Sequence, residues 1–555
     1  MITNIPAHES LTVEFKSDRS KLRDSDLVSI VMCLANTEGG QLYLGVEDDG
    51  TPTGLHGDHS DLPGMAALIA NRTRPPVNVQ VTLCEVAGHT LAQIDVPKTR
   101  QIVSTTDGVT QRRRIEADGK PACVPYYASE FDSRQSSLGL IDPSDRAILE
   151  ASEADFDPLE IERLRQMLDR YSTDYGLVEL TNGELLAALR LVQRVGDRRV
   201  PTVTGLLLLG REAALRQHLP THEIGFQVRD DTKVRVNTIN REPLLRAFER
   251  IREQFEARVE ESEVQVGFIR VPVPNYDYNA FREALINAVT HRDYTLLGTV
   301  LVRMETDGLI ISNPGGFVEG VTLTNLLVVE PKPRNPVLAD AMKRIGLAER
   351  TGRGVDVIYA SLLRYGRPPP DYSRSTANSV VVYIENVAPD LPFYTMVLEE
   401  ERRSGKRMPL DSLIVLNLLR KERRTDVQTA ATTMQKSISS ARSVLERLVE
   451  AGLVEAHGAT RERFYMLSAR VYRLFGQPTA YTRQAGSESA HCEERILQHL
   501  AQHGQVTRKT AAELCHLSAD QASYLLRSLR DAGKIKAVGK LAGTYYTIIP
   551  QEEIR

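Results

Sequence analysis

The sequence lacks the features of a membrane protein and of a disulfide-rich protein. No apolar run approaches the ~20 residues that a membrane span requires, and the polar start MITNIPAHES has neither the basic nor the apolar region of a signal peptide. The five cysteines, Cys33, Cys84, Cys123, Cys492 and Cys515, lie far apart and form no CxxC pair. This spacing favours a reducing cytosol over a disulfide framework or a structural zinc site. We therefore expect a cytoplasmic protein.

The chain as a whole also carries little net charge, −4 at pH 7, but the charge is distributed unevenly. Residues 401–555 hold 25 Lys and Arg against 16 Asp and Glu, a balance of +9. The remaining residues hold 44 basic against 57 acidic side chains, a balance of −13. A basic tail is typical of a nucleic-acid-facing module, although a solvated helical surface gives the same count.

Length and composition indicate several folded domains. A chain of 555 residues that is 41% hydrophobic and 26% charged is too long for one core, because single cores stop growing near ~250 residues. We predict an α+β multidomain protein. Its expected parts are a first α+β unit over 1–135, a helical linker over 136–200, a second α+β unit over 201–395, and two tail units over 400–475 and 485–555.

Hydrophobic periodicity predicts the main elements of both α+β units. In the first unit, helical spacing predicts a helix over 24–36, and alternation predicts the strands QLYLGV, VQVTLCEV, HTLAQIDVP and GVTQRRRIE. In the second unit we expect helices over 244–261 and in AFREALINAVTHR. The strands expected there are TVTGLLLLG, HEIGFQVRD, the pair in TVLVRMETDGLIISN, and SVVVYIE.

The tail contains an internal repeat, an inference that needs no outside comparison. LERLVEAGLVEAHGATRERFYML at 445–467 aligns without a gap with LRSLRDAGKIKAVGKLAGTYYTI at 526–548. Each copy predicts a helix, a glycine stop and two short strands, preceded by two more short helices. This order predicts two winged helix-turn-helix domains.

In that plan the third helix enters the major groove, and its start carries the side chains that face the bases. We assign this role to Gln435, Lys436, Ser437, Ser440 and Arg442 in the first copy, and to Ser518, Gln521 and Tyr524 in the second. The wings supply candidate phosphate contacts in Arg461, Arg463, Lys536 and Lys540. Winged helices also serve as protein-docking or dimerisation modules, and the serine-rich third helices leave both interpretations open.

Motifs in the second α+β unit are typical of a nucleotide site. EALINAVTHRDY puts Glu283 and Asn287 on one face of a helix, ISNPGGF ends a strand in a diglycine, and ERTGRGVD opens a further helix. The amide oxygen of Asn287 can bind Mg²⁺, and Glu283 can orient water as an ATPase base. The backbone N–H groups of four glycines can hold phosphate oxygens: Gly315, Gly316, Gly352 and Gly354.

These motifs resemble the ATPase fold shared by gyrase, MutL and histidine kinases, in the divergent form found at the C-terminal end of RecG-like proteins. EALINAVTHRDY, ISNPGGF, RNPVLADAMKRIGLAERTGRG and TGLLLLGRE carry the resemblance over most of residues 200–360. It implies bound ATP with Mg²⁺ and a lid over 317–350. Asn313 stands where an adenine-binding aspartate is usual. An amide oxygen accepts from an adenine amino group without charge, so we expect binding with slow or absent hydrolysis.

Two enzyme classes are excluded. The chain contains no GxxxxGK[ST] loop, so the resemblance to RecG-like proteins does not imply a P-loop helicase. The segment HRDY at 291–294 is not a kinase catalytic loop, because no DFG or APE follows it. We interpret it as the end of the nucleotide-site helix, with His291 and Arg292 near the lid.

The N-terminal motifs ESLTVEFK, LANTEGG and QLYLGVEDDGTPTGL resemble the Schlafen-type AlbA-like domain over residues 1 to about 130. In Schlafen nucleases, two glutamates five positions apart and a later aspartate bind divalent metal and cut RNA, and these map onto Glu9, Glu14 and Asp48. Such carboxylates would form a hard-oxygen site for Mg²⁺ or Mn²⁺ that activates water, with Lys16 beside them. Alternatively, they are outer residues of an edge strand and of a solvated turn.

A later strand carries three consecutive arginines, Arg112, Arg113 and Arg114. Together with Lys16 and Lys98 they can hold a nucleic-acid backbone near the acidic residues. Without metal, the same acidic residues would repel phosphate.

The sequence leaves two functional hypotheses from different classes. In the first, an ATP-binding, nucleic-acid-binding protein carries a metal-dependent Schlafen-type nuclease for RNA such as tRNA, or for DNA. Nucleotide state would control it in stress or anti-phage defence. In the second, the protein is an ATP-responsive DNA-binding transcriptional regulator without nuclease activity. Both imply a nucleic-acid partner and a homo-oligomer.

Overall fold

The computed structural model describes the greater part of the chain, residues 5–116, 119–171, 174–230, 232–266, 269–348, 353–458, 463–475, 492–515, 517, 519–539 and 544–548. It forms two compact units, Met1–Pro143 and Ser144–Arg555. In this described part, no helix is long and apolar enough to cross a membrane.

The first unit is built on a four-stranded sheet of order β1-β2-β5-β4, formed by Val13–Lys16, Gly40–Leu44, His89–Val96 and Gln80–Val86. Strand β1 runs parallel to β2, because helix α1 (Asp24–Ala35) forms the crossover between them. One face of the sheet packs against α1 and α2 (Leu62–Arg72) in a core that includes Leu27, Leu42 and Ile94. The predicted helix and strands of this unit are confirmed.

A hairpin of β7 (Gln111–Ile115) and β8 (Pro121–Pro125) packs against α1. It brings Cys123 to the buried Cys33 of α1, and the two form a disulfide with Cα atoms 6.0 Å apart. The prediction that the cysteines form no disulfide was therefore wrong for this pair. The two cysteines are 90 positions apart in the sequence, so only the tertiary fold brings them into contact. The remaining elements of this unit are η1 (Gly57–His59), β3 (Thr73–Arg74), β6 (Ser104–Thr105) and α3 (Ala128–Ser137).

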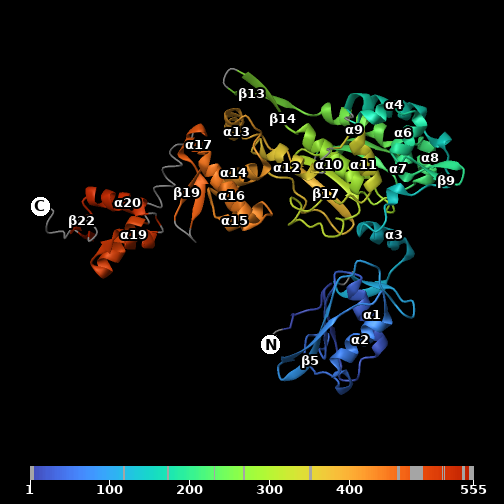
Figure 1. The fold of residues 1–555 in the computed structure, drawn as a ribbon, viewed down its shortest axis with the longest axis horizontal. Helices are drawn as coiled ribbons and strands as arrows, with labels where there is room; N and C mark the ends of the chain where they lie inside the picture. The colour runs from blue at the N-terminus through green and yellow to red at the C-terminus, as the bar shows by residue number, and fades with distance from the viewer. Residues whose placement is uncertain are drawn as a thin grey trace. The chain divides into compact units, whose positions relative to one another are not determined.

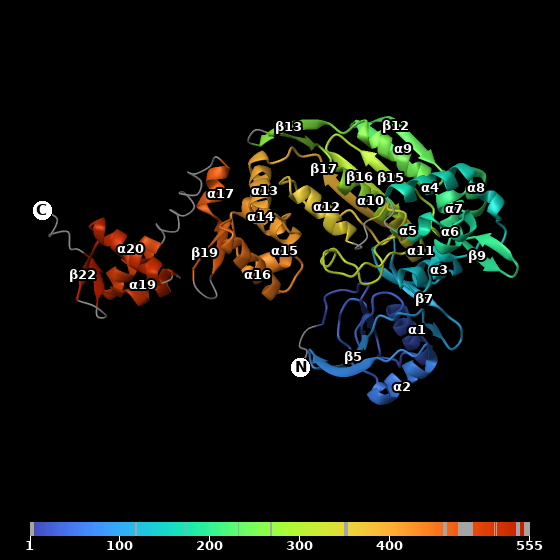
Figure 2. The same ribbon diagram turned by 45° about the horizontal axis from the view of Figure 1, so that its top comes forward.

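The second unit contains a five-stranded sheet of order β12-β11-β15-β16-β17, formed by Lys233–Asn240, Ile224–Asp230, Val300–Met304, Gly308–Pro314 and Ser379–Glu385. Helices α9 (Leu244–Glu256) and α10 (Tyr278–His291) lie against it, and α12 (Gly354–Leu363) packs on α10 (Figure 2). Helix α11 (Pro336–Arg344) follows the loop after β16. The predicted helix α10 and strands β11, β15, β16 and β17 are confirmed.

Two predicted elements differ from the structure. TVTGLLLLG forms the helix α7 (Val203–Leu209) instead of a strand, with the Thr202 hydroxyl accepting from the Gly205 N–H at 3.0 Å as N-cap. Every residue of α7 is buried, and a short, uniformly apolar run does not distinguish a buried helix from a buried strand. The helix predicted over 244–261 ends at Glu256, because residues from Glu261 onward pair as β13 (Glu261–Val266) with β14 (Ile269–Pro274).

Most of the predicted helical linker over 136–200, from Ser144 onward, is part of the folded second unit. Leu164, Leu168 and Leu185 share one hydrophobic core with Leu206 of α7 and Phe226 of the sheet. The elements of this segment and its continuation are η2 (Pro143–Asp145), η3 (Glu153–Asp155), α4 (Pro158–Tyr171), α5 (Tyr175–Val178), α6 (Asn182–Ala188), β9 (Val192–Val195), β10 (Arg198–Pro201) and α8 (Glu212–His218).

The tail repeat is confirmed as a structural repeat of helices and a three-stranded sheet (Figure 1). The first copy consists of α13 (Leu391–Ser404), α14 (Leu410–Glu422), β18 (Arg424–Thr425), α15 (Val427–Thr433), α16 (Ile438–Glu450), β19 (Val454–His457), β20 (Phe464–Leu467) and α17 (Ala469–Leu474). The second consists of a helix over 492–503, β21 (Val506–Thr507), α19 (Arg508–Cys515), α20 (Ala519–Asp531), β22 (Ile535–Val538) and β23 (Tyr545–Ile548).

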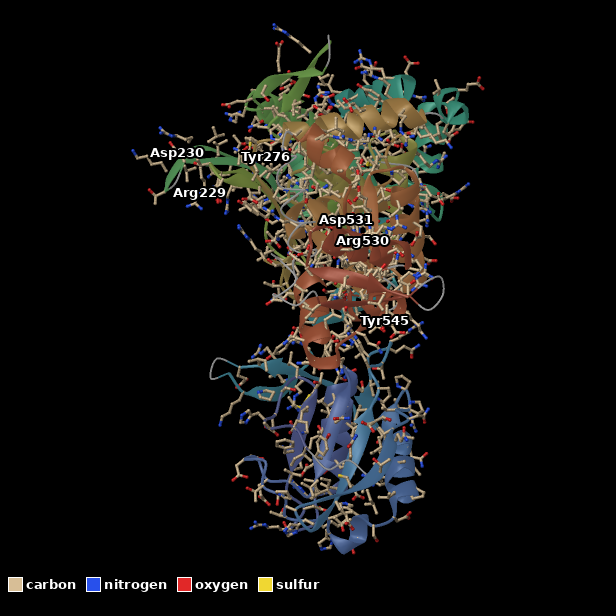
Figure 3. The ribbon with its side chains drawn as sticks, turned by 90° about the vertical axis from the view of Figure 1, so that its left-hand side faces the viewer. Arg229, Asp230, Tyr276, Arg530, Asp531 and Tyr545 are labelled. Atoms are coloured by element: carbon tan, nitrogen blue, oxygen red, sulfur yellow. A yellow bond between two sulfur atoms is a disulfide. The ribbon has the colours of Figure 1, made fainter. Side chains whose placement is uncertain are left out.

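Equivalent glycines follow α16 and α20, Gly452 with φ 70° and Gly533 with φ 71°. The left-handed conformation suits glycine and stops the helix before the hairpin. At the end of α20, Arg530 and Asp531 form an ion pair of 2.7 Å, and Tyr545 begins β23 (Figure 3). The assignment of these copies as winged helices stays a prediction.

Candidate functional site

A cavity of about 570 Å³ opens in the second unit between α10, β16, α12 and the segment 316–332, which we call the lid segment. Four residues predicted for the nucleotide site line it: Asn287, Asn313, Gly316 and Gly354. Gly352 lies outside the described residues. The volume is in the range of small-molecule and cofactor sites.

The start of α12 lies close against the middle of α10. A Cβ atom added to Gly354 would stand 2.9 Å from Oε2 of Glu283 and 3.2 Å from Nδ2 of Asn287. A residue with a side chain would clash here, so glycine lets the start of α12 pack directly on Glu283 and Asn287 of α10.

Glu283 is placed differently from its predicted role. It does not line the cavity, its side chain is only 2% exposed, and its Oε1 pairs with the Arg282 guanidinium at 2.8 Å. The buried Glu283 carboxylate is thus held by Arg282 and packs against the start of α12. Its role as an ATPase base stays a prediction.

The diglycine after β16 is required by the backbone. Gly315 has a φ of 93°, and a Cβ at Gly316 would lie 2.5 Å from the carbonyl oxygen of Ala377. Just before them, the buried Asn313 donates its Nδ2 to the Pro314 carbonyl at 3.1 Å. In the described part of the chain Oδ1 of Asn313 has no hydrogen bond, so it is the atom available to accept from a base.

Two residues of the HRDY segment have different roles: His291 lines the cavity, and Arg292 stabilises loops inside the unit. His291 lines the cavity, and burial together with the Arg334 charge lowers its pKa to about 4, so its ring is neutral near pH 7. Arg292 is fully buried and donates to the carbonyls of Thr221, Leu296 and Gly298. The prediction that Arg292 lies near the lid was wrong, because its guanidinium satisfies loop carbonyls inside the unit.

The cavity also contains residues that the motifs did not indicate. The lid segment contributes an apolar wall from Val318, Val321, Leu326, Leu327, Val328 and Val329. Tyr372, which is buried, and Lys436 of the first tail copy also line the cavity. The resemblance predicted a lid over 317–350 without indicating this wall, for which the apolar run in the sequence was the available signal. No sequence signal predicted Lys436 at the cavity, because it lies in the first tail copy, far along the chain from the nucleotide-site motifs.

In the first unit, the predicted acidic residues are held by cations. Glu14 pairs with Nζ of Lys16 at 2.5 Å and with the buried Arg113. Glu9 accepts from the Phe15 N–H at 3.0 Å and lies 3.9 Å from Lys16. These contacts engage both carboxylate oxygens of Glu14 and Oε1 of Glu9.

Asp48 lies in the exposed turn after β2. Among the residues that the structure describes, no group of three His, Cys, Asp or Glu side chains is arranged to hold a metal ion. The predicted trio of Glu9, Glu14 and Asp48 is thus not assembled as a metal centre. Glu9 precedes β1 whereas Glu14 lies on it, so a spacing of five residues does not by itself make the side chains converge. Arg113, 99 positions after Glu14, lies next to it instead.

Residues 9–119 match the family described as "Schlafen, AlbA_2". Residues 298–384 match the family described as "Putative ATP-dependent DNA helicase recG C-terminal". The chain carries a Schlafen AlbA-like domain and a RecG-like C-terminal domain. The two family resemblances predicted from the sequence are confirmed. Residues 138–225 match a domain of unknown function, which covers most of the predicted linker.

The fold is similar to the crystal structure of the DIP2311 protein from Corynebacterium diphtheriae. The two chains are 24% identical, the alignment covers 84% of this chain and 94% of that one, and the TM-score is 0.51. This similarity concerns the fold alone. No curated protein matches the chain.

The two domain types suggest a nucleic-acid-related, ATP-binding protein, with Mg²⁺ as the usual companion of ATP. The RecG-like segment contributes β15, β16 and β17, whereas α10 with Asn287 precedes it and completes the cavity. In the Schlafen AlbA-like domain, Arg112 pairs with Glu130, Lys98 pairs with Glu38 at 2.8 Å, and Arg114 is exposed.

The residues predicted to contact nucleic acid in the tail have different surroundings. Arg442 is exposed on α16, and Arg463 pairs with Glu446 at 3.1 Å. Gln521 lies on α20 and Lys536 on β22. Three further predicted contacts lie outside the described residues: Arg461, Ser518 and Lys540.

Proposed function

We propose that this protein is an ATP-responsive nucleic-acid-binding protein in which nucleotide state in the central cavity controls binding by the tail. The observation that carries the proposal is the cavity that brings together Asn287, Asn313, Gly316 and Gly354 from three separate motifs. A chance turn or surface helix would leave these residues apart. The RecG-like match supports ATP as the nucleotide.

The residues of the cavity fit a nucleotide with Mg²⁺. The start of α12 lines the cavity with its backbone at Gly354, and a helix start suits an anion. The Asn287 amide oxygen is a suitable hard ligand for the ion, and Asn313 Oδ1 can accept from the base amino group. The ion, when bound, neutralises phosphate charge. Because Glu283 is paired with Arg282 and outside the cavity, ligand binding is favoured over rapid hydrolysis.

Binding to DNA is tested on the exposed face of α16. Arg442→Ala removes one exposed cation from this helix without touching the core. We expect weaker retention of duplex DNA by about 1 kcal/mol and a salt slope that is lower by about one, because each phosphate contact releases roughly one counterion. Fluorescence anisotropy at several salt concentrations measures both. Unchanged affinity and slope would favour the protein-docking interpretation of the tail.

The nuclease hypothesis predicts metal-dependent cutting of RNA, whereas the contacts of Glu14 lead to the opposite expectation. Because Glu14 is engaged by Lys16 and Arg113, we expect the intact protein with Mn²⁺ to bind labelled tRNA without cutting it. The assay is denaturing electrophoresis of the RNA after incubation with and without ATP. Cleavage that is lost in both Glu14→Gln and Asp48→Asn would establish the nuclease and reject the regulator.

A further inference from the structure

The turn between α15 and α16 reaches the lid segment. Gln435 donates its Nε2 to the Leu323 carbonyl at 2.9 Å and accepts from the Leu327 N–H at 3.0 Å through Oε1. One side chain of the first tail copy thus holds two backbone groups of the lid. Gln435 does this with a φ of 55°, a conformation that costs a non-glycine residue roughly 1 kcal/mol or more.

The next residue, Lys436, lines the nucleotide cavity. Its Nζ pairs with both carboxylate oxygens of Asp411 at 2.7 and 2.8 Å, and the Lys436 side chain is about one-third exposed. A lysine at the wall of a cavity, paired with a single, partly buried carboxylate, can exchange that partner for a more highly charged anion.

The second copy indicates that this charged pair is not needed for the fold. In the gapless alignment of the two copies, Lys436 corresponds to Leu517 and Asp411 corresponds to Cys492. Leu517 and Cys492 both pack against the hydrophobic core of the second copy. The same positions are apolar and structural in one copy, and charged in the copy that borders the cavity.

Helix α12 provides a second connection between the cavity and the first copy. It begins at Gly354 in the cavity, and Leu363 at its other end belongs to the core of the first copy together with Leu416. Asn417 also donates to the Leu363 carbonyl at 2.9 Å. A displacement of the start of α12 can therefore be transmitted to the first tail copy through this rigid helix as well as through the lid segment.

The first copy is also the more basic of the two. Residues 401–475 hold 15 Lys and Arg against 8 Asp and Glu, whereas residues 492–555 hold 9 against 7. The turn that contacts the lid directly precedes α16, which carries exposed Arg442 and Arg447. Contact with the nucleotide cavity and positive surface charge coincide in one copy.

We propose that Gln435 and Lys436 form a latch that couples the nucleotide to nucleic-acid binding by the first tail copy. Gln435 holds the lid segment over the ligand, and Lys436 leaves Asp411 to bind the terminal phosphate. This inference rests on the proposed nucleotide site. Because coupling between two ligands is reciprocal, nucleotide and DNA must change each other's affinity by the same factor. The second copy, with Leu517 in place of the lysine, takes no part in the coupling.

The experiment uses the full chain with Mg·AMP-PNP, Mg·ADP and a labelled duplex of random sequence. Gln435→Gly removes both lid hydrogen bonds, and glycine suits the left-handed conformation, so folding is preserved. We expect about tenfold faster AMP-PNP dissociation, from the loss of two hydrogen bonds. The melting temperature should change little, because relief of the left-handed conformation offsets part of the lost hydrogen bonding.

Lys436→Met tests the phosphate contact, because methionine keeps the length of the side chain. We expect the affinity for AMP-PNP to fall about tenfold, as for loss of one charge-assisted contact, while the affinity for ADP stays within about twofold. A structural role would change both nucleotides alike. Lys421→Met is the matched control, since Lys421 is an 83% exposed lysine of the same copy, and it should change neither.

The wild-type chain should show an AMP-PNP-dependent change in duplex affinity that both latch variants lose. If AMP-PNP changes duplex affinity equally in wild type and in Gln435→Gly, the latch is rejected while the nucleotide site stands. If the wild-type chain binds no AMP-PNP, the proposed function fails, and the latch fails with it.

Discussion

Replacing Asn287 by alanine is expected to weaken Mg·AMP-PNP binding by roughly 100-fold, because a ligand of the ion and a contact to the phosphates are lost together. Asn287 lines the cavity from the middle of α10, and its amide lies next to the start of α12. Isothermal titration calorimetry of the full chain measures the change directly.

The matched control is Asn279→Ala, the same chemical change in an exposed residue of the same helix. It should leave nucleotide affinity within about twofold, because surface substitutions away from special features have small effects. Equal affinities in wild type, Asn287→Ala and Asn279→Ala would reject the proposed cavity. A loss of helical signal in the circular dichroism spectrum of the whole chain would identify unfolding as a separate cause.

The sequence predicted those lining residues of the cavity that depend on local backbone geometry, and the nucleotide itself stays a proposal. Helical spacing places Asn287 on a buried face, and the diglycine Gly315–Gly316 marks a turn that no other residue fits. Such signals survive in a single sequence because they are local. These local signals therefore indicate residues that line the cavity without any information on tertiary contacts.

The parts that the sequence did not predict depend on contacts between distant segments. Lys436 reaches the cavity from another repeat, and Cys33 meets Cys123 across 90 residues. Spacing also predicted the wrong partner for Glu14, whose neighbours Lys16 and Arg113 turn a hypothetical metal ligand into an ion-paired residue. Composition and periodicity hold no information about which charges meet in the folded chain.

Arg113 illustrates the consequence for experiments, and its replacement is expected to have the largest effect on stability in the first unit. It is only 2% exposed, pairs with Glu14, and donates to the Val13 carbonyl at 2.9 Å. Arg113→Ala leaves a nearly buried carboxylate with Lys16 as its remaining charged partner. Removing one member of a buried pair costs about 3 kcal/mol or more, so we expect the first unit to lose that much unfolding free energy.

Arg114→Ala is the control, because this neighbouring arginine is half-exposed and lies 3.7 Å from the exposed Glu116. Its loss should change stability by less than about 0.5 kcal/mol, while it lowers RNA affinity in proportion to one phosphate contact. Hydrogen–deuterium exchange of peptides containing β1 and β7 reports stability, and filter binding reports RNA affinity. Faster exchange in Arg113→Ala alone identifies Arg113 as the residue that fixes β1. If both variants exchange like wild type and both weaken RNA binding, Arg113 contacts nucleic acid instead, and Glu14 is free to act as the nuclease hypothesis requires.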